Sequence, residues 1–173
     1  NMWAIYKKEI KTLFTTLEAY VAISIFFISN SLVLWNIPSN FNIFYNNQAS
    51  LNPFFYTAPL ILLLLMPAIT MKLINSEITQ KTNLILLTKP IKLWELVIAK
   101  FLASFSVGVV AIIPSVVFVY SIYQLSSPKG NIDIGELLGS YMGLLLLSAT
   151  YVSIGIFCSS VSKNNMIAFI STI

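Results

Sequence analysis

The chain has 173 residues, of which 57% are hydrophobic and only 9% are charged, and its formal net charge is +4. An ordinary soluble domain has about a quarter of its residues charged, so this composition excludes a mostly water-exposed surface and favours lipid as the solvent. All ten basic residues are lysines, and the chain has no histidine and a single cysteine, Cys158, which excludes a histidine proton shuttle, an internal disulfide and a cysteine cluster.

The N-terminal residues 2–17 predict an amphipathic helix. Apolar side chains recur there at spacings of three and four, and lysines fill the opposite face. The apolar set is Trp3, Tyr6, Ile10, Leu13, Phe14 and Leu17, and the polar set is Lys7, Lys8, Lys11 and Thr15. A helix of this kind lies in the membrane interface and binds anionic headgroups. The alternative is a plain extension of the first span.

Four apolar segments follow, each long enough at about 20 residues to cross a bilayer. They cover residues 19–37, 53–71, 96–125 and 137–161. Residues 166–173 become apolar again and predict the start of a fifth span, so we expect the chain to be part of a longer protein. The first segment lacks a small-residue cleavage site, which predicts an uncleaved anchor.

The lysines predict the orientation of the spans. With the N-terminus inside, nine of the ten lysines fall on the inner side and only Lys129 falls outside, which agrees with the excess of lysine in cytoplasmic loops. Lys100 is the only charged residue within the core of a span. It lies near the start of the third span, where its long side chain is expected to reach the interface.

Polar side chains within the spans are mainly hydroxyls, with one amide at Asn30. Hydroxyls in such helices commonly bond a carbonyl of their own helix, and we expect this of Ser24, Ser104, Ser115, Ser148 and Thr150. Ion-coupled transporters mark their pathways with buried ionisable groups. Their scarcity here argues against a secondary transporter or channel.

Small residues form two stripes that predict close helix packing. One stripe is Gly135, Gly139 and Gly143, and the other is Ser104, Gly108, Ala111 and Ser115. Three prolines inside spans, Pro59, Pro67 and Pro114, are expected to kink their helices, because each removes a backbone donor.

The connection between the second and third spans, residues 72–95, is too polar to cross a membrane and too apolar for a solvated loop. Pro90 suits the first turn of a helix, and Leu93 and Trp94 continue that helix toward the third span. A short helix with an apolar face is suited to docking on lipid or on a partner protein.

The order of these features resembles the permease subunits of ABC-2-type ABC transporters. Those chains carry the pattern E-x-x-x-G-T-x-x-x-L-L-x-x-P-I after the second span and a lysine at the start of the third. Matching residues here are Glu77, Thr82, Leu86, Leu87, Pro90, Ile91 and Lys100, whereas Lys81 stands where the family has glycine. Stretches such as Met66-Pro-Ala-Ile-Thr-Met71 and Gly130-Asn-Ile-Asp-Ile-Gly135 are similar to the gliding-motility subfamily.

The resemblance implies an all-α membrane protein, half of a type V exporter, with six spans in the complete permease. It also implies a bacterial inner-membrane location, a second permease subunit, and a separate ABC ATPase that docks on residues 72–95. The residues implied for that coupling are Glu77, Lys81, Thr82, Leu86, Leu87, Pro90, Ile91 and Trp94.

The chain itself lacks the G-x-x-x-x-G-K-[ST] loop that holds nucleotide phosphates, since none of its six glycines precedes a lysine. We therefore expect no catalytic residues, no cofactor or metal, and no nucleic-acid partner in this chain. A non-transporting membrane scaffold of a gliding or secretion complex is the alternative hypothesis.

Overall fold

The computed structural model describes residues 2–46, 50–71, 73–74, 92–162 and 164–173, with the side chains of 45 and 46 left aside. Within these ranges every regular element is a helix and none is a strand. Four helical stretches are long and apolar enough to cross a membrane: Leu17–Asn36, Asn52–Thr70, Leu93–Leu125 and Ile134–Val161. The prediction of an all-α membrane protein is confirmed.

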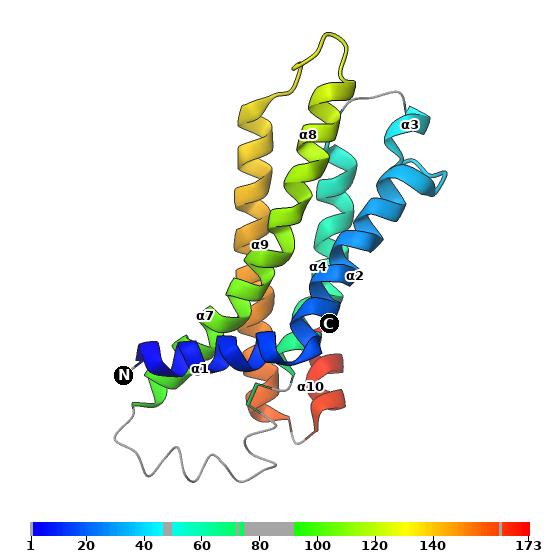
Figure 1. Ribbon diagram of the computed structural model, residues 1–173. Coiled ribbons are helices and arrows are strands. Elements are labelled where there is room, and N and C mark those ends of the chain that lie inside the picture. Colours follow the sequence, from blue (N-terminus) through cyan, green and yellow to red (C-terminus); the bar gives the residue numbers. More distant parts are fainter. Residues whose placement is uncertain (1, 47–49, 72, 75–91, 163) are drawn as a thin grey trace.

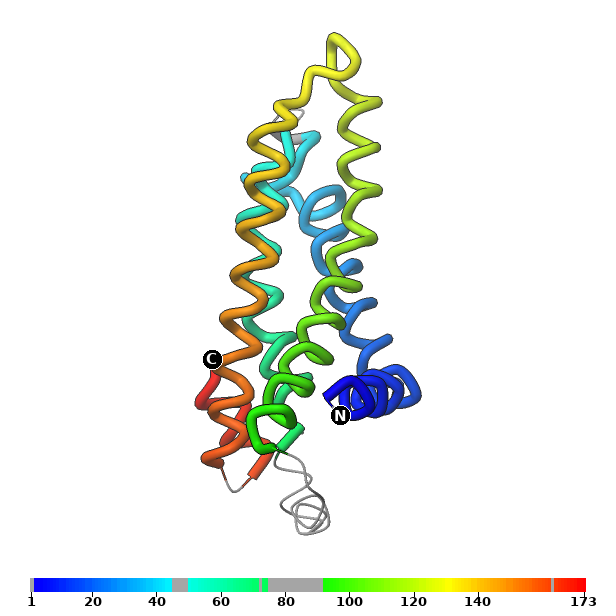
Figure 2. Tube along the Cα trace, turned by 90° about the vertical axis from the view of Figure 1, so that its left-hand side faces the viewer, coloured from blue at the N-terminus to red at the C-terminus, as the bar shows by residue number. Residues whose placement is uncertain are grey.

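The first helix, α1 (Met2–Thr15), runs across one end of the bundle (Figure 1). The turned view shows it nearly end-on, beside the lower part of the long helices (Figure 2). We call this end of the bundle the base. Helix α1 packs against α7 (Leu93–Ile112) and α2 (Leu17–Ser31), so one of its faces is covered by protein.

Helix α2 rises from the base and ends in a π-helical turn, η1 (Leu32–Asn36), which is followed by the short helix α3 (Ile43–Asn46). Helix α4 (Asn52–Thr70) then returns to the base. It begins with Pro53 in its first turn, where a missing N–H is tolerated. It continues as one α-helix past both Pro59 and Pro67.

The third stretch is divided at Pro114, as predicted. Helix α7 ends at Ile112, a 3₁₀ turn η2 (Ile113–Ser115) follows, and α8 (Val116–Leu125) completes the stretch. Proline removes an intrahelical donor and its ring crowds the preceding turn, which accounts for the change of helix type at this point. Helix α7 begins at Leu93, so the last residues of the 72–95 connection are already helical.

A loop over residues 126–133 leads into α9 (Ile134–Val161) at the end of the bundle opposite the base. Gly130 has a φ of +87° and a side chain there would lie 3.1 Å from the Tyr123 ring, so the turn requires glycine. The Asp133 side chain caps α9 by accepting hydrogen bonds from the backbone N–H groups of Gly135 (2.9 Å) and Glu136 (3.1 Å).

The last helix, α10 (Asn165–Thr172), packs on α9 and α4 at the base. The Cys158 thiol on α9 donates to the Ser171 carbonyl at 3.3 Å and is half-buried. The cysteine is therefore a contact between α9 and α10. Whether residues 166–173 begin a further span stays a prediction.

The buried core runs between the long helices, and the part of it farther from the base is rich in aromatic side chains. Phe54 of α4 lies 6.4 Å from Phe26 and 5.8 Å from Phe118, measured between ring centroids. Phe27 stacks on Phe118 at 5.1 Å. By contrast, large apolar side chains such as Leu60 are exposed on the outer faces of the spans. Apolar residues both inside and outside are what a lipid solvent allows.

Candidate functional site at the base of the bundle

A buried ion pair joins α1 to α7 at the base. The Lys100 Nζ lies 3.6 Å from the Glu9 Oε1, and the two side chains are 1% and 8% exposed. Glu9 lies on the same side of α1 as the buried Ile5 and Leu13, because positions four apart share a helix face. Lys8 also approaches the Glu9 carboxylate, at 3.5 Å, but its side chain is 59% exposed.

The same ammonium group reaches the chain that leaves α4. Lys100 Nζ donates a hydrogen bond of 2.6 Å to the backbone carbonyl of Leu73. Leu73 follows the end of α4 at Thr70 and lies at the start of the 72–95 connection. A charge-assisted bond of this length is strong in a water-poor setting. Lys100 therefore connects three elements: α1, α7 and the exit from α4.

Helix α9 makes a second attachment to the exit from α4. The Ser159 hydroxyl donates to the Met71 carbonyl at 3.1 Å and accepts from the backbone N–H of Ile74 at 3.4 Å. Backbone groups just beyond a helix end have no intrahelical partner, and Ser159 supplies one for both. We call Glu9, Lys100 and Ser159, with the backbone of residues 71, 73 and 74, the base junction.

The structure corrects one prediction for this region. Lys100 does not extend to the interface, because its side chain is buried and its ammonium group pairs with Glu9 and Leu73. Helix α1 packs against α7, with Ile5, Glu9 and Leu13 buried and Trp3 61% exposed. An interfacial position for residues 2–17 stays a prediction.

Sequence reasoning missed Glu9, although the sequence contains a signal for it. Ile5, Glu9 and Leu13 are spaced by four, which places the carboxylate in an apolar stripe. Lys100 is likewise a single charge in an apolar segment. Two opposite charges, each placed where burial is otherwise expected, indicate a pair, because an unpaired buried charge is very unfavourable.

The residues implied for ATPase coupling lie mostly outside the described residues. These are Glu77, Lys81, Thr82, Leu86, Leu87, Pro90 and Ile91. Trp94 is described: it is the second residue of α7, at the base, and its side chain is largely exposed. The base junction holds residues 71, 73 and 74, immediately before this segment, and the start of α7 follows it.

The two small-residue stripes have different surroundings. Ser104, Gly108 and Ala111 are buried, and a methyl group added at Gly108 would lie 2.7 Å from the Met66 Cε of α4. The second stripe is on α9. A methyl group added at Gly139 or Gly143 would have no atom within 4 Å, and one at Gly135 would meet only the capping Asp133. That stripe makes no helix contact among the described residues, and its packing role stays a prediction.

Among the described glycines, one outside both stripes makes the closest approach to another helix. At Gly155 of α9, an added methyl group would overlap the Thr70 Oγ1 of α4 and lie 2.9 Å from its Cβ. The absence of a side chain at Gly155 lets the two spans meet near the base junction.

The predicted role of the hydroxyl groups is confirmed in three cases. Ser115, Ser148 and Thr150 each donate to a carbonyl three residues earlier in the chain. Ser104 differs, because its buried Oγ has no hydrogen-bond partner in the part of the chain that the structure describes.

Other hydroxyl contacts join separate helices. Ser115 also contacts the Tyr141 hydroxyl of α9 at 2.8 Å. Thr57 donates to the Oδ1 of the fully buried Asn30 at 3.0 Å, which links α4 to α2.

Two hollows lie along the bundle, and the second of them reaches Met71 at the base junction. One, of about 280 Å³, is at the opposite end of the bundle and is lined by polar groups that include Asn131, Asp133 and Glu136. The other, of about 440 Å³, is an apolar groove between α2 and α4 with Glu18 at its margin. In the described ranges, no three His, Cys, Asp or Glu side chains come together as a metal site would require.

A family model described as ABC-2 family transporter protein matches residues 3–172. The chain belongs to this family. The match takes in α1, all four candidate spans and α10, so the base junction of this ABC-2 chain lies wholly within the family domain. Curated proteins and solved structures gave no match. Membership identifies a transmembrane component of an ABC transporter.

Proposed function

We propose that this chain is the permease subunit of an ABC-2-type exporter, in which a separate ATPase subunit drives substrate across the bacterial inner membrane. The family match over residues 3–172 carries the proposal. Four spanning helices supply a membrane path, and the sequence has no phosphate-binding loop of its own. We assign the system to gliding motility on the sequence resemblance described above.

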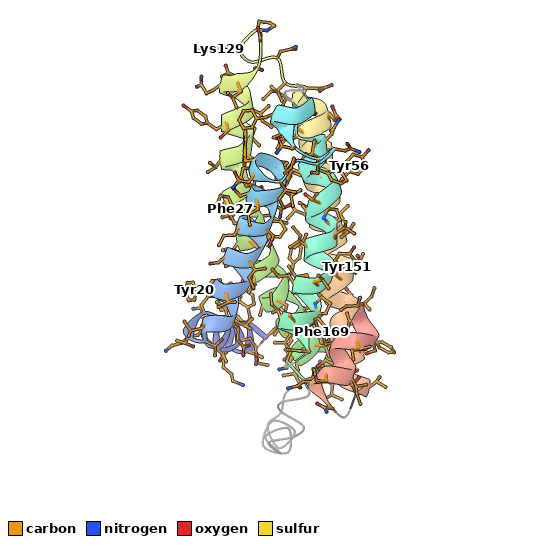
Figure 3. The ribbon with its side chains drawn as sticks, turned by 90° about the vertical axis from the view of Figure 1, so that its right-hand side faces the viewer. Tyr20, Phe27, Tyr56, Lys129, Tyr151 and Phe169 are labelled. Carbon is orange, nitrogen blue, oxygen red and sulfur yellow. The ribbon has the colours of Figure 1, made fainter. Side chains whose placement is uncertain are left out.

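The distribution of lysines supports a cytoplasmic base. The described lysines of α1, together with Lys92 and Lys100 of the α7 region, lie at the base. Lys129 lies at the opposite end of the bundle from Tyr20 and Phe169 (Figure 3). Cytoplasmic loops carry the excess of lysine in membrane proteins, so the base and the N-terminus are assigned to the cytoplasm.

The ATPase subunit is proposed to dock beneath the base, on the segment Glu77 to Trp94. The exposed Trp94 at the start of α7 offers a large apolar anchor of the kind enriched in protein interfaces. The base junction links residues 71, 73 and 74, which precede this segment in the chain, to α1, α7 and α9.

A second permease subunit is proposed to complete the pathway. The outward-facing stripe Gly135, Gly139 and Gly143 allows a helix backbone from another chain to approach α9 closely. This proposal derives from the family, whose members work in pairs.

Co-purification tests the function. The full-length permease is expressed with the ATPase encoded beside it, extracted in detergent and captured through a tag on the permease. We expect the ATPase to be retained, and to be lost when residues 77–94 are replaced by a Gly/Ser linker of equal length. A Lys129→Met variant, altered at the far end, serves as the control. Retention of the ATPase by the linker variant would contradict the coupling assignment.

ATP turnover separates transport from the alternative scaffold role. A permease changes the turnover of its ATPase in lipid vesicles, whereas a scaffold binds without changing it. Equal turnover with and without the permease, despite stable association, would favour the scaffold.

A further inference from the structure

We infer that Glu9 and Lys100 are positioning residues that hold α1 and α7 in a fixed relation to the start of the 72–95 connection. A displacement of that connection then moves α1, α7 and the exit from α4 together. This inference rests on the proposed function, because it assigns the pair a role within ATPase coupling.

The first argument is the place of the contacts in the chain. The connection leaves α4 at Thr70 and enters α7 at Leu93. The Lys100–Leu73 bond joins residues 27 apart in the sequence. It therefore fastens the start of the connection to α7, about 10 Å along the helix from the first residue of α7. The start of the connection is thus held against the helix in which the connection ends.

The second argument is the kind of interaction. Apolar contacts between helices tolerate small sliding movements, because dispersion and burial are not directional. A hydrogen bond weakens steeply when its distance or angle changes. The Lys100 ammonium group is held by such a bond at 2.6 Å and by the Glu9 carboxylate at 3.6 Å. The bond to Leu73 therefore fixes α7 against the exit from α4 more tightly than apolar packing does, and the ion pair with Glu9 attracts α1 to the same point.

The third argument is that stability alone is a weak reason for this pair. Desolvation of two buried charges largely offsets their attraction, and well-packed apolar residues are often as stable or more so. A buried pair is best attested where it fixes a register or serves a switch. Here the pair would fix the positions of α1 and α7 relative to the start of the 72–95 connection. Lys8 is no substitute, because it contacts the Glu9 carboxylate from α1 itself.

The test uses the full-length permease with its ATPase in lipid vesicles. The decisive variant is Glu9→Gln/Lys100→Met, which removes both charges and leaves neither one unpaired. We expect it to remain monodisperse and to retain the ATPase. Permease-dependent ATP turnover should fall about tenfold, within the usual range of coupling between protein sites. The control Lys11→Gln, an exposed lysine of α1, should leave turnover unchanged.

A distance measurement separates positioning from a purely structural role. Spin labels are placed at Lys7 of α1 and Lys92 before α7, both exposed, in a Cys158→Ala background. With the pair intact, their separation should stay constant between the ATP-bound and nucleotide-free complexes. In the double variant it should change between these states.

Turnover that is unchanged in the double variant overturns the inference, and so does loss of ATPase association, which would make the pair part of docking alone. If the double variant does not insert, Glu9→Asp carries the same test, because it keeps both charges but shortens the acidic side chain by one methylene; permease-dependent turnover should again fall. Failure of the proposed function is a distinct outcome, because the unaltered permease would then retain no ATPase.

Discussion

Replacement of Gly155 by alanine tests the closest approach between two spans. Gly155 lies in α9 opposite Thr70, at the end of α4 that leads into the base junction. An added methyl group would overlap the Thr70 Oγ1 and lie 2.9 Å from its Cβ and 3.3 Å from its Cγ2. Threonine has two χ1 rotamers in a helix, but its Cβ is fixed by the backbone, so rotation cannot relieve the 2.9 Å contact and the helices must separate.

Two opposing terms determine the size of the effect. Overpacking of a well-filled interior costs about 1–3 kcal/mol. Alanine in the middle of a helix is more favourable than glycine by about 0.5–1 kcal/mol. The matched control is Gly143→Ala in the same helix, where an added methyl group meets nothing within 4 Å. Since both variants gain the helix term, their difference isolates the overlap, which we expect to be about 1–3 kcal/mol.

The free energy of unfolding is measured for both variants by titration with SDS in mixed micelles, followed by circular dichroism. Gly143→Ala should be stabilised slightly, and Gly155→Ala should be destabilised relative to it. Adding Thr70→Ala to Gly155→Ala removes the Oγ1 and Cγ2 contacts but leaves the Cβ, so it should restore part of the loss.

Equal shifts in the two alanine variants would refute the reasoning, because they would show that α4 and α9 do not meet at Gly155. An additive double variant would have the same meaning. Residues in contact are expected to show an interaction energy of about 0.5–3 kcal/mol.

Three further predictions concern buried polar groups, each measured as the free energy of unfolding in the same micelles. Lys100→Met should lower the free energy of unfolding by about 3–5 kcal/mol, because it removes the partner of the buried Glu9 carboxylate. Adding Glu9→Gln should recover much of that loss; no recovery would show that the two charges are not coupled. Asn30→Leu should cost about 0.5–1.5 kcal/mol through loss of the Thr57 bond, and a stabilised variant would contradict the contact. Tyr141→Phe removes the hydrogen bond to Ser115 and should cost about 0.6 kcal/mol, the average for hydrogen bonds between membrane helices. The same substitution should cost nothing in a Ser115→Ala background, and equal losses in both backgrounds would argue against the bond.

The fold class follows from the sequence because lipid imposes a simple rule. A segment of about 20 apolar residues with no water to satisfy its backbone must be helical. Proline is a weaker guide: a 3₁₀ turn interrupts the third stretch at Pro114, whereas α4 continues as one α-helix past Pro59 and Pro67. The fold class therefore needs only local information, but the effect of each proline does not follow from local sequence alone.

The packing of the helices against each other could not be predicted in the same way. The regular spacing of Gly135, Gly139 and Gly143 is the more obvious motif, yet those residues face away from the other described helices. The single Gly155 makes the closest contact because Thr70 happens to lie opposite. Whether a small residue is an approach point depends on the neighbouring helix, which the spacing within one helix does not specify.

The base junction was partly accessible from sequence. Lys100 stands out in the sequence as an isolated charge, but a long side chain near a helix end more commonly reaches the interface. Pairing with Glu9 depends on α1 lying against α7, and the bond to Leu73 depends on the path of the chain beyond α4. These are tertiary relations between residues far apart in sequence.

The most direct test of the account is the ATP turnover of the partner ATPase in lipid vesicles, measured with and without the full-length permease. The account predicts that the ATPase associates with vesicles only when the permease is present, and that its turnover then changes. It further predicts that replacement of residues 77–94 by a Gly/Ser linker abolishes both effects. An ATPase that neither associates with the permease nor changes its turnover would contradict the central claim.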